Sequence, residues 1–144
     1  MSQEIIAKIH TTFEEGHNKG NLNVLDAIIA PDYQRHQPPM KSVKGLNAYK
    51  EFIKDVRSAY SDFEIRIEDI IVSDDKSVTR ITLTGKHTGQ APTLQAPPTG
   101  KQIEMKACVV SYWKGGKVIE EWVYNDYLGL LQQFGVIPLP GLFA

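Results

Sequence analysis

Over the first 60 positions, apolar side chains repeat at the three- to four-residue spacing of amphipathic helices. The first stripe ends before Gly20, a residue suited to the left-handed conformation that closes many helices. A second, short helix follows, with Asn21 as its expected N-terminal cap and Pro31 as its end. The third stripe is the clearest and predicts a helix from about residue 44 to residue 60. The stripes consist of Ile5, Ile6, Ile9 and Phe13; of Leu22, Leu25, Ile28 and Ile29; and of Leu46, Tyr49, Phe52, Ile53, Val56 and Tyr60.

After Tyr60 the apolar period changes from helical to two, which is typical of strands with one buried face. Gly115 and Gly116 give a two-residue hairpin signal between the last two of these strands. A short strand or extended loop is expected over 32–39, and a final short helix carries the apolar residues from Leu128 to Phe134. The four main strands are expected over 63–71, 77–88, 101–114 and 117–125.

Helices followed by a run of antiparallel strands predict an α+β fold, with the helices covering one side of a curved sheet. The 144 residues suffice for one core, so a single domain over 1–144 is expected. A curved sheet cannot contact its helices everywhere, and the gap between them predicts an apolar pocket. The apolar segment 138–143 is expected to lie on the domain or on a partner.

Charge and composition narrow the function classes. The net charge is −1, from 16 basic and 17 acidic residues without a long block of one sign, so neither nucleic acid nor a membrane is expected as a partner. Cys108 is the only cysteine, and the histidines lack metal-ligand spacing, so no disulfide and no metal site are expected. The N-terminus shows no signal-peptide pattern and no apolar run reaches about 18 residues, which favours a cytoplasmic location.

Six short segments, spread over nearly the whole chain, form a recognisable series: 17–21, 31–33, 84–89, 97–101, 116–122 and 126–135. Together and in this order they resemble the SnoaL-like polyketide cyclases, also called ester cyclases, of the NTF2-like superfamily. The resemblance implies an NTF2-like cone, also described as a cystatin-like α+β barrel, around an apolar pocket. It also implies a homodimer and a reaction without metal or cofactor, in which a pocket carboxylic acid promotes an intramolecular aldol ring closure.

The last strand departs from the family pattern at the position of its chemistry. The family's acid/base aspartate falls at Val123, and its polar partner on the preceding strand falls near Val109. The resemblance therefore supports the fold more strongly than the aldol reaction, since a shared fold does not fix a reaction.

Three residues are candidates for the acid/base role. Asp126 is either a general acid/base at the pocket rim or the N-terminal cap of the last helix, and we favour the cap. Glu121 shares a strand face with Val123 and is either a base in the pocket or a charge in an ion pair. His36 is either a proton relay at the pocket mouth or a surface histidine, and its aromatic and basic neighbours favour the relay.

Other residues are expected to bind or enclose the ligand. Tyr33, Arg35 or His87 would polarise a substrate oxygen, although a lone histidine such as His87 on an apolar strand face is more often a packed core residue. Aromatic side chains on the last two strands would supply surface for a flat hydrophobic molecule. The residues expected in the pocket wall are Val109, Trp113, Trp122 and Val123.

Two functions of different classes follow. The first, which we favour, is a cofactor-free enzyme that uses general acid/base catalysis to cyclise, isomerise or hydrolyse a small hydrophobic carbonyl or ester compound. The second is a non-catalytic module that binds a small hydrophobic molecule in the same pocket. The apolar residues at Val109 and Val123 motivate this second function.

Overall fold

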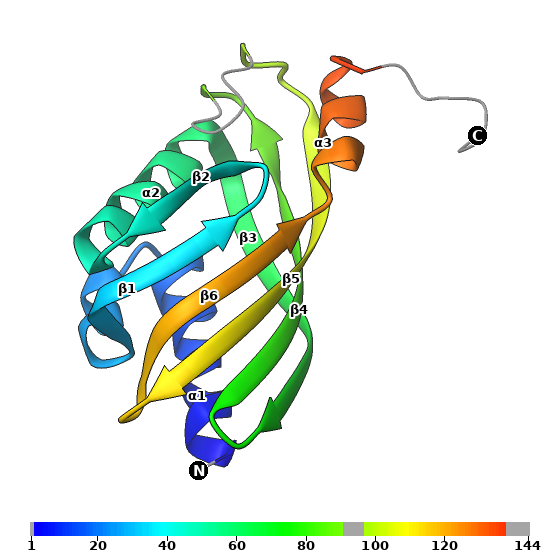
Figure 1. The fold of residues 1–144 in the computed structure, drawn as a ribbon. Helices are drawn as coiled ribbons and strands as arrows, with labels where there is room; N and C mark the ends of the chain where they lie inside the picture. The colour runs from blue at the N-terminus through cyan, green and yellow to red at the C-terminus, as the bar shows by residue number, and fades with distance from the viewer. Residues whose placement is uncertain (1, 91–96, 138–144) are drawn as a thin grey trace.

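A curved sheet with helices on its concave side forms the body of the protein (Figure 1). The computed structural model describes residues 2–90 and 97–137. Helix α1 (Ser2–Thr11) continues directly into a π-helical segment (Thr12–Asn18), and a 3-10 helix (Leu22–Ala27) follows. Helix α2 (Leu46–Ala59) lies beside them, and helix α3 (Tyr127–Phe134) follows the last strand.

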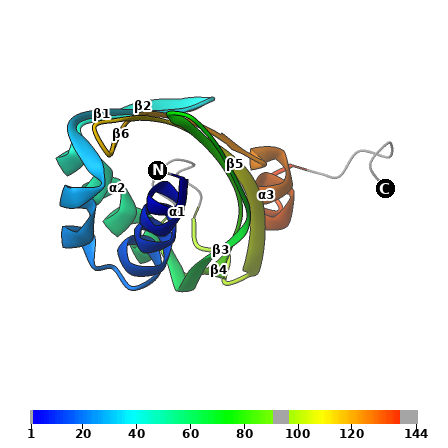
Figure 2. The same ribbon diagram turned by 90° about the horizontal axis from the view of Figure 1, so that it is seen from below.

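The sheet has six strands in the order β2-β1-β6-β5-β4-β3. Neighbouring strands are antiparallel except β1 and β6, which run parallel. Figure 2 shows how the sheet bends around α1, so the predicted α+β fold with a helix-covered curved sheet is confirmed. The strands are β1 (Ile29–Gln37), β2 (Met40–Lys44), β3 (Tyr60–Ser73), β4 (Lys76–His87), β5 (Gln102–Lys114) and β6 (Lys117–Asn125).

The segment around Pro31 differs most from the expectation. Strand β1 begins at Ile29, so Pro31 lies inside a strand and does not end a helix. The pairing of β1 with β6 shifts register between Ile29 and Gln34, and a proline is tolerated at such an irregularity because its missing N–H removes no ladder hydrogen bond. Asn21 makes no capping hydrogen bond with its side chain, and the segment after it is a 3-10 helix.

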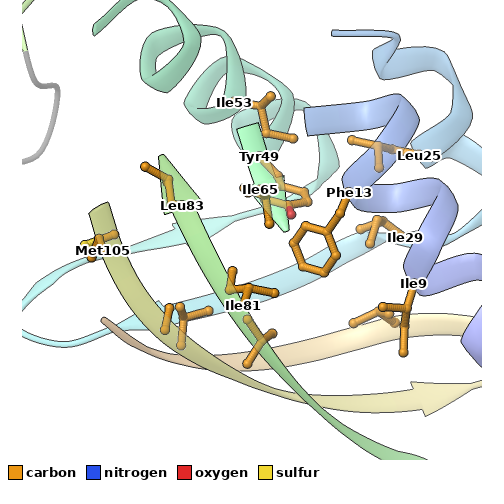
Figure 3. Close-up of a cluster of buried hydrophobic side chains, with 14 of the residues drawn as sticks. Ile9, Phe13, Leu25, Ile29, Tyr49, Ile53, Ile65, Ile81, Leu83 and Met105 are labelled. Carbon is orange, nitrogen blue, oxygen red and sulfur yellow. The ribbon is translucent and has the colours of Figure 1, made fainter. Parts of the chain in front are cut away.

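Alternation along the strands separates the core from the outer surface. The face of β5 predicted to point inward is buried along its whole length, and the residues between are half-buried or exposed. Figure 3 shows side chains from α1, α2 and the strands meeting in this core, with the Phe13 ring among them. The inward residues of β5 are Ile103, Met105, Ala107, Val109, Ser111 and Trp113.

The convex face of the sheet carries an aromatic depression formed by Val110, Tyr112, Trp122 and Tyr124. Tyr124 is 54% exposed. The homodimer stays a prediction, and the segment 138–143, expected on the domain or on a partner, lies outside the described residues. None of the helices within 2–90 and 97–137 combines the length and hydropathy of a membrane span.

Candidate functional site

The concave side of the sheet encloses a cavity of about 70 Å³, which is room for about five water molecules. Its wall is mostly apolar, and its polar residues come from the π-helical segment, β1, the end of β6 and the first residues of β3 and α3. Leu130 of α3 and Phe52 of α2 also line the cavity. The polar wall residues are His17, Arg35, Gln37, Tyr60, Asn125 and Tyr127.

Glu121 is the centre of a buried hydrogen-bond network across three strands. The Tyr33 hydroxyl donates to Glu121 Oε1 at 2.5 Å, and the Ser111 hydroxyl donates to Glu121 Oε2 at 2.5 Å. Arg35 Nη1 lies 3.4 Å from Glu121 Oε1. Strand register makes this network, because Arg35 on β1 and Ser111 on β5 both pair with Glu121 on β6. Burial and the neighbouring Glu121 carboxylate raise the pKa of Tyr33 well above its ordinary value, so its hydroxyl stays a donor.

Arg35 lies in the cavity wall with its guanidinium beside two aromatic rings. Its Cζ is 5.1 Å from the Tyr49 ring centre and 5.4 Å from the Phe52 ring centre, distances typical of cation–π contacts. Its Nε donates to Gln37 Oε1 at 3.3 Å. Only 10% of the side chain is exposed, so the charge is largely shielded from bulk solvent.

Glu121 does not lie in the wall of the main cavity. It faces an inner recess of about 10 Å³, and Phe13 lines both the recess and the cavity. The carboxylate and the main cavity are therefore neighbours on the two sides of one aromatic ring.

His17 is a cavity residue that the sequence analysis does not identify as a site residue. Its Nε2 lies 2.7 Å from the Tyr49 hydroxyl, and its ring stacks at a tilt on Phe13 with centres 5.2 Å apart. Burial, assisted by the charges of Arg35 and Arg57, lowers the pKa of His17 to about 3. The imidazole is thus neutral near pH 7 and acts there as a hydrogen-bonding group. Its four-residue spacing from Phe13 is the one sequence signal that it shares the apolar stripe.

Asp126 takes the structural role of the two considered. Its side chain accepts a hydrogen bond from the Gly129 backbone N–H at 2.9 Å and caps α3. The carboxylate is exposed, and the neighbouring wall residues are Asn125 and Tyr127.

His36 lies on the convex face of the sheet and not at the pocket mouth. Its ring stacks on Trp122 with centres 4.1 Å apart, and its Nε2 lies 2.8 Å from Glu120 Oε2. The reason is strand alternation: Tyr33 and Arg35 point inward, so the residue after Arg35 points outward. Trp122 lies on the same convex face and does not line the cavity, so the prediction that it forms part of the pocket wall is wrong.

His87 is buried at the end of β4 and helps to fix α3. Its ring stacks on Phe134 with centres 4.3 Å apart, and its Nδ1 accepts a hydrogen bond from the Thr99 backbone N–H at 3.3 Å. It is absent from the cavity wall among the described residues. The structure therefore places it as a packed core residue.

The other wall residues expected from the sequence lie on the concave side. Val109 and Val123 face each other in adjacent strands, and both are almost fully buried. Val123 lines the cavity, and Val109 lines the recess together with Trp113. Within 2–90 and 97–137 no three His, Cys, Asp or Glu side chains group as metal ligands.

Together, the curved sheet, the covering helices and the single polar end of an apolar cavity define the class as an NTF2-like α+β cone. The family model of the SnoaL-like polyketide cyclases matches residues 7–134, and the chain belongs to this family. The family expected from the six sequence segments is confirmed. A comparison with curated proteins finds no match.

Solved structures agree with this fold over nearly the whole chain. A protein from Jannaschia sp. CCS1, provisionally named a SnoaL-like polyketide cyclase, is 22% identical with a TM-score of 0.83, covering 94% of both chains. TsrD from Streptomyces laurentii is 24% identical with a TM-score of 0.79, covering 94% of this chain and 96% of its own. IdmH from Streptomyces antibioticus, provisionally named a polyketide cyclase, is 26% identical with a TM-score of 0.75, covering 92% of this chain and 99% of its own.

Proposed function

We propose that this protein is a cofactor-free enzyme that moves a proton on a small hydrophobic carbonyl or ester compound held in the cavity. The observation that carries the proposal is the polar end of the cavity, where the Arg35 guanidinium lies in the wall and the Glu121 carboxylate lies directly behind. A carboxylate and a fixed cation beside an apolar space are the groups that proton abstraction next to a carbonyl requires.

In this proposal Glu121 accepts the proton and Arg35 holds the oxygen that becomes negative. The carboxylate is ordered by the Tyr33 and Ser111 hydroxyls, so its orientation is set before the ligand binds. Arg35 stabilises an enolate or a tetrahedral oxyanion by charge and by hydrogen bonding. Phe13 moves aside to let the reacting carbon reach the recess. Ring closure, isomerisation and hydrolysis all use such a pair of groups.

A second function, binding without catalysis, is favoured by one specific observation. Val109 and Val123, at which the family pattern places its polar groups, are paired across β5 and β6 and are apolar. Without an acid at Val123, the main cavity has no carboxylate in its own wall among the described residues. A module that only binds would need no more than this apolar space.

Solvent deuterium exchange distinguishes the two functions without knowledge of the natural substrate. The protein is incubated in D₂O with phenylacetone or with 4-oxo-4-phenylbutanoate, and loss of the proton next to the ketone is followed by ¹H NMR. A general base accelerates this step, and Glu121→Gln should slow the protein-dependent exchange by about 100-fold or more. The matched control is Glu120→Gln, which makes the same change at the adjacent residue on the outer face.

The enzyme proposal requires exchange that depends on Glu121 and not on Glu120. If both ketones bind but the wild type exchanges them no faster than protein-free buffer, the binding module remains as the function. An equal decrease of the exchange rate in Glu121→Gln and Glu120→Gln would show that Glu121 is not the general base. Thermal unfolding of each variant confirms that it is folded at the temperature of the assay.

A further inference from the structure

Arg35 is a buried cation whose hydrogen-bond donors are incompletely used. Its three hydrogen bonds, to Gln37, Tyr33 and Glu121, are long, at 3.3, 3.4 and 3.4 Å. Its Nη2 has no hydrogen-bond acceptor among the residues of 2–90 and 97–137, and it is not among the fully enclosed polar atoms. A buried guanidinium with five N–H donors is costly unless these are satisfied, so a further acceptor in the cavity would stabilise it.

Glu121 does not fill this need, although it carries the opposite charge. Its two oxygens receive short hydrogen bonds of 2.5 Å from Tyr33 and Ser111, whereas the contact with Arg35 is 3.4 Å. The carboxylate is thus held mainly by two neutral hydroxyls. Arg35 lines the main cavity, and its Nη2 has no acceptor among the described residues, so the space that a ligand would occupy lies beside a donor that is not used.

The positive charge of Arg35 also acts on groups across the cavity. It contributes, after burial, to the lowered pKa of His17, and it opposes the effect of burial on the pKa of Tyr127. His17 and Tyr127 belong to different elements and both line the cavity. Arg35 is the one Lys, Arg, Asp or Glu residue in the cavity wall among the described residues, and most of the remaining wall is apolar.

We propose that Arg35 is an anion-binding residue and that the natural ligand carries a carboxylate, or another anionic oxygen group, attached to a hydrophobic body. A carboxylate on Nη2 would replace missing hydrogen bonds with charge-assisted ones. A cavity with room for about five waters suits a body of about one ring. The inference rests on the proposed function, which treats this cavity as the ligand site and has Arg35 hold the oxygen that becomes negative. The ligand's own anionic group would bind at Nη2, which has no acceptor among the described residues.

Isothermal titration calorimetry at pH 7 with 3-phenylpropanoate and 3-phenylpropanamide tests the inference. The two probes share their size and shape and differ in charge. The wild type should bind the acid about 10- to 100-fold more tightly than the amide, the range expected for a hydrogen bond to a charged group. Arg35→Gln should bind both compounds equally, and Arg35→Lys, which keeps the charge and loses the planar fork, should show a smaller preference than the wild type.

Arg66→Gln is the matched control, because it removes the same charge from an exposed side chain on β3. The preference for the acid should persist in this variant. Three results would overturn the inference: equal or tighter binding of the amide by the wild type, loss of the preference in Arg66→Gln, or no saturable binding of the acid at millimolar concentrations. If Arg35→Gln does not fold, NMR of the wild type tests the inference instead. The side-chain ¹⁵N–¹H chemical shift of Arg35 should change when 3-phenylpropanoate is added and should stay the same when 3-phenylpropanamide is added.

The inference and the proposed function fail under different results. Arg35-dependent binding of the acid without Glu121-dependent deuterium exchange would retain the anion site and remove the enzyme. Glu121-dependent exchange with equal affinity for acid and amide would retain the enzyme and remove the anion site.

Discussion

Two pairs of a basic and an acidic residue lie back to back on strands β1 and β6, one on each face of the sheet. On the concave face, Arg35 contacts Glu121 at 3.4 Å, and each side chain is 10% exposed. On the convex face, His36 contacts Glu120 at 2.8 Å, with side chains 20% and 41% exposed. Arg35 and His36 are consecutive residues on β1, and Glu120 and Glu121 are consecutive residues on β6. Because successive side chains of a strand point to opposite faces, the two pairs lie on opposite faces of the sheet.

The difference between the pairs shows that surroundings outweigh contact distance. The outer pair has the shorter contact, but water competes for both groups and the net contribution to stability is small. The inner pair has a longer contact, but both side chains are only 10% exposed, so bulk water competes for them much less than for the outer pair. A shorter distance therefore does not identify the functional pair, whereas burial beside a cavity does.

The largest expected effect is on stability. Glu121→Ala removes the partner of a buried cation and leaves the Tyr33 and Ser111 hydroxyls without their acceptor, so a loss of about 3–5 kcal/mol is expected. Glu120→Ala should change the free energy of unfolding by about 1 kcal/mol or less. Urea denaturation of the two variants measures both values. Similar losses in the two variants would contradict the comparison.

The next largest effect is on the pH dependence of the free energy of unfolding, to which the buried His17 on the concave side contributes. Its pKa in the folded protein is about 3, below the ordinary value of 6.5, so the unfolded chain binds more protons between these values. This contribution to stability is therefore complete above pH 6.5 and is lost as the pH falls toward 3. Its full size is of the order of 5 kcal/mol.

His17→Gln should remove this part of the pH dependence, since glutamine does not titrate and can still hydrogen-bond to Tyr49. Denaturant unfolding of the wild type and the variant at several pH values between 4 and 7 measures the two slopes. The variant should lose less stability on acidification than the wild type. Parallel slopes would show that His17 is not held neutral by the fold.

The fold could be predicted from the sequence because its signals are local. Strand period, the hairpin glycines and the helical stripes each involve only near neighbours, and β6 has the predicted bounds. The entry into β1 could not be predicted in this way. Pro31 is a breaker in both helices and strands, and only the pairing with β6, far away in the sequence, provides the irregularity that accommodates it.

The candidate site could be predicted in part. The alternation on β6 correctly places Glu121 and Val123 on one face, and the same rule applied to β1 would have separated His36 from its neighbours. Arg35 and His17 owe their importance to contacts between distant elements. No sequence pattern predicts the π-helical segment that carries His17, and none predicts that aromatic rings lie beside the Arg35 guanidinium.

The smallest expected effect on stability concerns Asp126, which directly follows β6, and it tests whether this carboxylate takes part in the reaction or only caps α3. Asp126→Ala removes a helix cap and should lower the free energy of unfolding by about 1 kcal/mol. Asp126→Asn can still cap the helix and should change the free energy of unfolding by only a few tenths of a kcal/mol. Neither variant should change the deuterium exchange of a bound ketone, because the carboxylate is exposed and serves the backbone of α3. A stable Asp126→Asn variant with abolished exchange would instead make Asp126 the proton acceptor. The chemistry would then move from the β1–β6 network to the rim of the cavity.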